Sequence, residues 1–334
     1  MKVAIIHDNP EVTRLLRQIL ASTEHDVCWD CNTSNTAIDL CRNNLPDLLL
    51  LKLDMPDMPA TDLVRTIMST TPTTIIVISK SIKKHPGKVF EAMSAGALDA
   101  FSEPSNDDPQ SINDLLRKIK NINSLHKATK TSPLPIQGQV DKSLPLIAIG
   151  ASTGGPAALV KVLSKFPVKP HAVIVVIQHM DNQFSEGMAK WIDEQTRTKV
   201  EIAQANQKPK PGIVYIAAGD DHLILNKSCH FDYIAEPVDY PYRPSVDVFF
   251  ESAVMHWPNK MIGVLLTGMG RDGANGLLSF YNRGMMTIAQ DEASCAVFGM
   301  PKAAINLNAA QKILHIDEIG MAINDLLQPT EIKQ

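Results

Sequence analysis

Apolar runs of four to six residues alternate with amphipathic segments from residue 2 to about residue 122. Strands that are apolar along nearly their whole length, alternating with helices, are typical of a parallel sheet covered on both faces. We therefore predict a small doubly wound α/β domain over residues 1–124. Its strands are expected at Val3–Ile6, Asp26–Cys31, Leu48–Leu53, Thr74–Ile78 and Leu98–Phe101, and its helices near Glu11–Ala21, Asn35–Asn43, Asp62–Ser69, Val89–Ala95 and Asp108–Ser124.

The composition changes over residues 125–143, which are rich in Lys, Thr, Ser, Pro and Gln and indicate a linker. A second α/β domain is predicted over residues 144–334. Short runs between residues 200 and 235 are separated by turn residues, and we expect them to form a β-hairpin excursion rather than another βα unit. The strongest strands are expected at Leu146–Gly150, Ala172–Gln178 and Met261–Thr267, and the short runs are Gly212–Ala217, His222–Leu225 and Phe231–Ile234.

Each strong strand of the second domain ends near a residue that can take part in chemistry. Ser152 follows the first strand in a strand–turn–helix segment, His179 follows the second, and Asp272 follows the third. Parallel strands bring their carboxyl ends to one edge of a sheet, so we expect these three side chains to converge. A serine hydroxyl needs an adjacent base, and a carboxylate can orient an imidazole for that task. The pattern predicts acyl hydrolysis.

Structural alternatives exist for each of these residues. The turn around Ser152 could serve close packing alone, His179 could be a hydrogen-bonded histidine at the rim, and Asp272 could be the N-cap of the following helix. The coincidence of three such residues at one sheet edge favours catalysis. Glycines in these turns would let peptide N–H groups approach an oxyanion, and we expect the donors near His179 and Met269.

Composition narrows the classes of function. The formal net charge is −4 with interspersed charges, which argues against nucleic-acid binding. No apolar run reaches 18 residues, so no membrane insertion is expected. Five cysteines without the density of a disulfide scaffold, and an N-terminal run too short for a signal peptide, favour a cytoplasmic location. The hydrolysis itself needs no metal and no organic cofactor.

Five segments of the second domain resemble the chemotaxis protein-glutamate methylesterases. They occur in the order of that family and are Ile149–Pro156, Gln178–Met180, Arg243–Asp247, Leu266–Ala274 and Glu292–Pro301. The first domain resembles a response-regulator receiver. The resemblance implies two doubly wound parallel-sheet domains, a flavodoxin-like receiver followed by a Rossmann-like methylesterase domain with the hairpin excursion.

The resemblance implies a serine esterase that removes methyl groups from glutamates on the cytoplasmic helices of methyl-accepting chemoreceptors and releases methanol. Many members also deamidate glutamines. By the same match Ser152 is the nucleophile, His179 the base and Asp272 the orienting carboxylate. Thr153 and Met269 occupy active-site positions, and the amide of Met269 belongs to the oxyanion hole. The segment Arg243–Asp247 shapes the cleft in one interpretation, and its Ser245 is only a helix N-cap in the other.

The receiver site departs from the pattern of its family. That family holds Mg²⁺ with two acidic residues after the first strand, phosphorylates an aspartate at the end of the third, and has a lysine after the fifth. Here the acidic pair is His7 and Asp8, Lys52 stands at the acceptor position, Ser79 is retained, and Glu103 replaces the lysine. Lysine cannot form an acyl phosphate. The sequence therefore predicts a pseudo-receiver without the usual phosphorylation.

Lys52 and Glu103 look like an exchange of the usual charges, and we predict that they pair directly across neighbouring strand ends. The alternative is two independent, solvated charges. Asp54, on the same strand face as Lys52, is a less favoured candidate for a displaced phosphate acceptor. Without phosphorylation the esterase could be constitutive, held in one docking of the receiver, or controlled by a protein such as a chemotaxis kinase or adaptor.

Two other functions compete with the chemoreceptor methylesterase. One is a non-catalytic adaptor on receptor arrays, which the complete set of Ser152, His179 and Asp272 disfavours. The other is an esterase for a different small carboxyl ester. Methanol release from methylated receptor would support the chemoreceptor methylesterase, and activity on a generic ester but not on methylated receptor would support the last. The sequence is silent on the particular receptor and on the oligomeric state.

Overall fold

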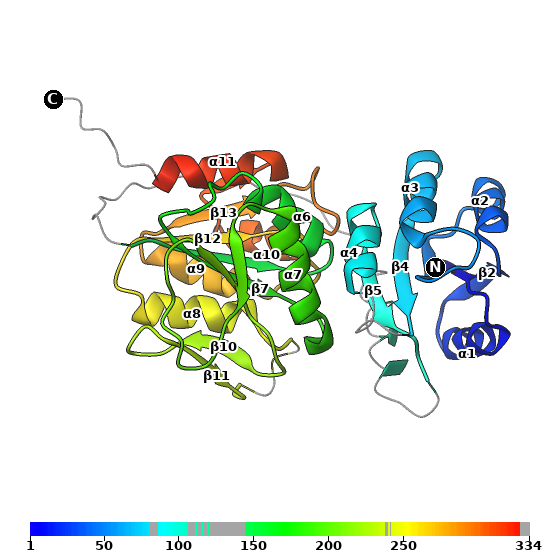
Figure 1. The fold of residues 1–334 in the computed structure, drawn as a ribbon, viewed down its shortest axis with the longest axis horizontal. Coiled ribbons are helices and arrows are strands. Elements are labelled where there is room, and N and C mark those ends of the chain that lie inside the picture. Colours follow the sequence, from blue (N-terminus) through cyan, green and yellow to red (C-terminus); the bar gives the residue numbers. More distant parts are fainter. Residues whose placement is uncertain are drawn as a thin grey trace. The chain divides into compact units, whose positions relative to one another are not determined.

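The computed structural model describes residues 1–80, 86–105, 111, 112, 115, 116, 119, 144–237, 240 and 242–327. The chain divides into two compact units, Met1–Lys127 and Ala128–Gln334, which Figure 1 shows as ribbons. Residues 125–143, interpreted above as a linker, lie outside the described residues. Of the helices in the described ranges, none combines the length and the apolar character that crossing a membrane requires.

The first unit is a five-stranded parallel sheet with the strand order β2-β1-β3-β4-β5. The predicted strands and the first four predicted helices are confirmed, with boundaries within three residues, and the described positions between 111 and 119 are helical. The elements are β1 (Lys2–Ile6), α1 (Pro10–Ala21), β2 (Asp26–Cys31), α2 (Ser34–Asn43), β3 (Leu48–Lys52), α3 (Ala60–Thr70), β4 (Thr74–Ser79), α4 (Pro86–Ser94) and β5 (Asp99–Ser102).

The second unit contains a seven-stranded parallel sheet with the order β14-β13-β12-β6-β7-β9-β8. Its strands are β6 (Leu146–Ala151), β7 (Val173–Gln178), β8 (Lys199–Ile202), β9 (Ile213–Ile216), β12 (Met261–Leu265), β13 (Met286–Gln290) and β14 (Lys312–Leu314). Its helices are α6 (Gly155–Leu163), the short 3₁₀ helix η3 (Asn182–Phe184), α7 (Ser185–Gln195), α8 (Val246–His256), α9 (Ala274–Asn282), α10 (Met300–Asn306) and α11 (Ile316–Leu327).

Helices cover both faces of this sheet. Every residue of β6 and β7 is buried, and alternate positions such as Leu146 and Ala148 join a core with α8, α9 and α10. The intervening positions, such as Ile147 and Ile149, point to the opposite face because strand side chains alternate. There α6 packs beside α7 and α11, as Figure 1 shows.

The predicted hairpin excursion is partly right. Strands β10 (His222–Leu225) and β11 (Phe231–Ile234) form an antiparallel pair outside the main sheet. The run at Gly212–Ala217 is not part of the excursion, however, because its strand β9 joins the main sheet parallel to β7 and β8. No helix lies between β8 and β9. The alternation of strands with helices, which indicates parallel strands in a sequence, is therefore missing there.

The strand order places the candidate site. β6 lies between β7 and β12 in the sheet, so the turns that follow these three strands are neighbours at one edge. Ser152, His179 and Asp272 were predicted to lie at this edge.

Candidate active site

Ser152 lies in a tight turn between β6 and α6. Its N–H donates to the carbonyl of Thr267 (3.0 Å), and its own carbonyl accepts from the N–H of Gly155 (2.8 Å) at the start of α6. Gly268 passes so close that a Cβ there would lie 2.7 Å from the Cβ of Ser152, which only glycine avoids. The serine is 7% exposed, and the turn holds its position from both sides.

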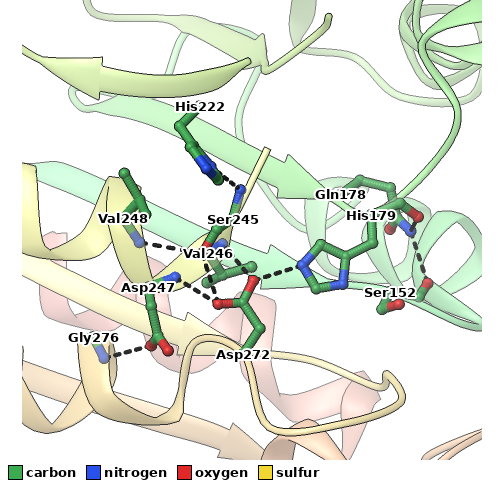
Figure 2. A network of polar contacts seen from close by, with 10 residues as sticks. All are labelled: Ser152, Gln178, His179, His222, Ser245, Val246, Asp247, Val248, Asp272 and Gly276. Atoms are coloured by element: carbon green, nitrogen blue, oxygen red, sulfur yellow. Dashed lines mark hydrogen bonds and ion pairs between the residues drawn. The ribbon is translucent and has the colours of Figure 1, made fainter. Parts of the chain in front are cut away.

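His179 lies between the other two predicted residues. Its Nε2 is 2.7 Å from Oδ2 of Asp272, and because a carboxylate only accepts, Nε2 must carry the proton. The opposite nitrogen, Nδ1, is buried and has no hydrogen-bond partner among the described residues. Figure 2 shows it on the side of Ser152. The structure thus brings Ser152, His179 and Asp272 together, with a lone pair of the imidazole turned toward the serine.

Asp272 accepts hydrogen bonds from the first turn of α8 as well as from His179. The hydroxyl of Ser245 and the N–H of Asp247 donate to Oδ1 (2.8 and 3.1 Å), and the N–H of Val246 donates to Oδ2 (2.7 Å). Burial works to raise the pKa of Asp272, but the hydrogen bond and charge of His179 and the helix N–H groups hold it below its ordinary value. The carboxylate is therefore kept ionised beside the imidazole.

These contacts answer the two questions about helix N-caps. Ser245 is the N-cap of α8, since its hydroxyl oxygen accepts from the N–H of Val248 (3.3 Å), and it also donates to Asp272. Asp272 is not the N-cap of α9, because Gly273 holds that position without a side-chain hydrogen bond. Its carboxylate is directed to α8 instead.

Thr153 and Met269 also lie at this edge and are 8% and 7% exposed. The hydroxyl of Thr267 donates to the carbonyl of Thr153 (3.0 Å) and fixes the turn. The N–H of His179 is already donated to Ala151 (3.0 Å). For the N–H of Met269 the described residues offer no acceptor, so of these two amides it is the one left for a ligand.

Three residues of the site were given no role from the sequence. The side-chain amide of Gln178 donates to the carbonyls of both Ser152 (2.8 Å) and His179 (3.0 Å), and Tyr242 stacks on the ring of His179. His222 accepts the N–H of Ser245 at Nδ1 (3.0 Å). A polar residue closing the apolar strand β7 was a usable signal for Gln178. Nothing local in the sequence indicated the other two.

Asp247 is a second buried carboxyl group behind the site. Its Oδ1 accepts the N–H of Gly276 (2.7 Å), and its own N–H donates to Asp272. Burial and the nearby charge of Asp272 raise the pKa of Asp247 to about 7. The folded protein therefore binds this proton more tightly than the unfolded chain does.

Replacing Asp247 with asparagine should stabilise the protein at pH 8 and leave its stability nearly unchanged at pH 4. Between the unfolded pKa near 4 and the folded pKa near 7, the native state holds more protons, so the free energy of unfolding of the parent falls as pH rises. Asparagine avoids this loss, up to about 4 kcal/mol, and still accepts from Gly276. Urea unfolding at both pH values measures the effect. An equal difference at both would contradict it.

The predicted pairing of Lys52 with Glu103 is wrong. Nζ of Lys52 lies 2.6 and 2.7 Å from the two carboxylate oxygens of Asp8. The strand order offers Lys52 a partner on the adjacent strand: β3, which carries Lys52, adjoins β1, and Asp8 follows β1. The ion pair between Lys52 and Asp8 takes the place of the predicted one.

Glu103 lies instead beside His7, with 3.5 Å between Oε2 and Nε2. Burial lowers the pKa of His7, although the charge of Glu103 opposes the shift. Ser79 is buried and its carbonyl accepts the N–H of Glu103 (3.0 Å). Asp54 is exposed and pairs with Lys88 of α4 (2.9 Å). Among the described residues no three His, Cys, Asp or Glu side chains are placed to hold a metal ion.

Comparison with known proteins assigns both units. Residues 147–323 match the family described as CheB methylesterase, and residues 3–118 match the response regulator receiver domain. The fold and the matched family define a hydrolase with a receiver unit before its esterase unit. The chain belongs to the CheB methylesterase family.

Relatives match over nearly the whole chain. The protein-glutamate methylesterase/protein-glutamine glutaminase of Mesorhizobium japonicum is 43% identical over 97% of this chain and 98% of its own. A protein of the same name from Pseudomonas aeruginosa, numbered 3, is 40% identical over 96% and 98%. The crystal structure of the CheB methylesterase catalytic domain of Thermotoga maritima covers 55% of this chain and 99% of that domain, with 36% identity and a TM-score of 0.53.

Proposed function

We propose that this protein hydrolyses glutamate methyl esters on the cytoplasmic helices of chemoreceptors and releases methanol, with Ser152 as nucleophile. The observation that carries the proposal is the placement of His179, held by Asp272 at one nitrogen and turned toward Ser152 at the other. The names of the relatives, which span almost the same length, support the protein-glutamate ester as substrate.

The first half of the reaction forms an acyl-enzyme. Ser152 Oγ attacks the ester carbonyl while Nδ1 of His179 takes the serine proton, and Asp272 stabilises the resulting imidazolium. The N–H of Met269 donates to the carbonyl oxygen as it becomes an oxyanion. Collapse of this intermediate breaks the bond to the methoxy group, which leaves as methanol with the proton from His179.

The second half regenerates the serine. A water molecule gives its proton to Nδ1 of His179 and attacks the acyl carbon, and Ser152 leaves with that proton. The product is the free glutamate. With a glutamine substrate the same steps release ammonia instead of methanol, so we extend the proposal to deamidation.

The test is methanol release from a receptor cytoplasmic fragment carrying isotope-labelled methyl esters. The full chain should release labelled methanol, and a fragment with its methylated glutamates replaced by aspartate provides the blank. Hydrolysis of a generic small ester without any release from the receptor would overturn the substrate. No hydrolysis of either would favour an adaptor.

We further propose that the first unit works without phosphate. The ammonium of Lys52 binds both oxygens of Asp8 and stands where the receiver family needs an aspartate. The residues present do not fit Mg²⁺, because one of the two expected acidic residues is His7 and the other is neutralised by Lys52. A lysine also offers no oxygen for an acyl phosphate.

Acetyl phosphate and beryllofluoride should leave the rate of methanol release unchanged. Neither can bind productively at Lys52, since the acceptor carboxylate is absent and the residues present do not fit Mg²⁺. The rate with Mg²⁺ and each reagent, divided by the rate with Mg²⁺ alone, should equal one. A receiver of the same family with an intact aspartate serves as the positive control. Clear stimulation of this protein would contradict the pseudo-receiver.

A further inference from the structure

Tyr242 lies flat against the imidazole of His179, yet the reaction described above gives it no task. The two ring centroids are 4.2 Å apart and the ring planes differ by 7°. Tyr242 belongs to the segment that leads into α8, and three residues later Ser245 donates to Asp272 (2.8 Å). One short segment therefore contacts both the base and its orienting carboxylate.

The stack limits how the imidazole can turn. The hydrogen bond from Nε2 to Asp272 fixes one edge of the ring, but that bond alone allows the ring plane to rock about it. A second ring in van der Waals contact across one face opposes this motion. Nδ1 of His179, which is buried and without a partner among the described residues, is thereby kept directed to Ser152.

We propose that Tyr242 is a positioning residue that speeds proton transfer from Ser152 by stabilising the imidazolium form of His179 against the face of its ring. The inference rests on the proposed roles of Ser152 and His179. The imidazole gains its positive charge only as the proton moves, and a cation is attracted to an aromatic face more strongly than a neutral ring is. An interaction that strengthens in the transition state lowers the barrier.

Other titratable groups lie near His179 and Asp272. Asp272 is bound to the ring, Asp247 and Glu251 of α8 lie within electrostatic reach of Asp272, and Tyr240 belongs to the segment of Tyr242. All of them stay unchanged when only Tyr242 is replaced. A difference between variants at this one position therefore reports the ring of Tyr242.

Two variants of the full chain separate the ring face from the hydroxyl. Tyr242→Phe keeps the stack, whereas Tyr242→Leu keeps apolar volume and removes the aromatic face. Labelling of Ser152 by a fluorophosphonate between pH 5 and pH 9 measures nucleophilicity without a receptor substrate. We expect Phe to match the parent within about twofold, and Leu to be slower by about 2- to 30-fold.

Two further measurements, the pH profile and the kinetic constants, distinguish the proposed role from a mere loss of packing. A loss of packing alone would not change both of them together. The acid limb of the labelling profile should shift to lower pH in Tyr242→Leu, because the imidazolium has lost a stabilising contact, and should stay in place in Tyr242→Phe. In methanol release, Leu should lower kcat and leave KM unchanged. Equal behaviour of Leu and the parent would overturn the inference, and so would a loss in Phe as large as in Leu.

A fluorinated series keeps the inference testable if Tyr242→Leu fails to fold. Phenylalanines carrying one, two and three ring fluorines have nearly the same shape but a progressively weaker negative face. The labelling rate should fall stepwise along this series, and a flat series would overturn the inference. Labelling of Ser152 without methanol release would overturn the proposed substrate while leaving this test valid. No labelling of the parent at any pH would overturn both.

Discussion

Replacing Ser152 with alanine is expected to lower methanol release by at least about 10⁴-fold. Without the hydroxyl no acyl-enzyme can form, and the remaining oxyanion donor and binding surface can assist only direct attack by water. The fold should be unaffected, because the hydroxyl makes no hydrogen bond with another described residue and the turn is held by backbone bonds. Stability should change by less than about 0.5 kcal/mol.

Ser164→Ala is the matched control, because this serine lies at the opposite end of α6 and its hydroxyl donates only to the carbonyl of Val160 (2.6 Å). It should retain full activity. Initial rates on methylated receptor and urea unfolding of both variants give the comparison. Substantial turnover by Ser152→Ala would mean that another group attacks the ester.

Replacing Asp272 with asparagine is expected to lower kcat by about 10⁴-fold. An amide nitrogen facing Nε2 of His179 cannot accept its proton, so the imidazole would move the proton to Nδ1. That nitrogen would then present a hydrogen to Ser152 rather than a lone pair, and the base would be lost. The turn and its backbone can remain in place, so the substrate should still bind.

The same substitution should also destabilise the protein. With the amide nitrogen facing His179, the N–H of Val246, which donates to the same carboxylate oxygen in the parent (2.7 Å), loses its acceptor. An unsatisfied buried donor costs about 1–3 kcal/mol. Denaturant unfolding measures this, with Asp317→Asn on the exposed start of α11 as control. A kcat within tenfold of the parent would exclude the assigned role of Asp272.

The sequence was sufficient to predict that residues meet where their meeting depends only on the direction of the strands. Ser152, His179 and Asp272 follow apolar runs that were predicted to be parallel strands, and the carboxyl ends of parallel strands share an edge. Their meeting therefore did not require the strand order. Lys52 and Glu103 also follow strands that end at one edge, but which carboxylate a lysine binds there depends on how the side chains are directed, and Lys52 binds Asp8 of the adjacent strand end.

The residues around Ser152, His179 and Asp272 were harder to predict, for a different reason. Tyr242 contacts His179 from the segment before α8, and His222 contacts Ser245 from the hairpin β10–β11. No periodicity in the sequence connects either residue with the site. Asp247 lies in the motif Arg243–Asp247, but its raised pKa depends on its burial and on the nearby charge of Asp272, which both arise only in the folded chain.

His222, at the start of β10 in the hairpin β10–β11, provides an experimental signal for the state of the site. Nδ1 of this fully buried residue accepts the N–H of Ser245, and Nε2 lies 3.2 Å from the carbonyl of Pro237. One partner can only donate and the other can only accept, so the imidazole exists as a single tautomer with its hydrogen on Nε2. Its nitrogen chemical shifts should therefore report, without any substrate, whether the turn that orients Asp272 is formed. A nuclear magnetic resonance spectrum could follow the formation of this turn in this way.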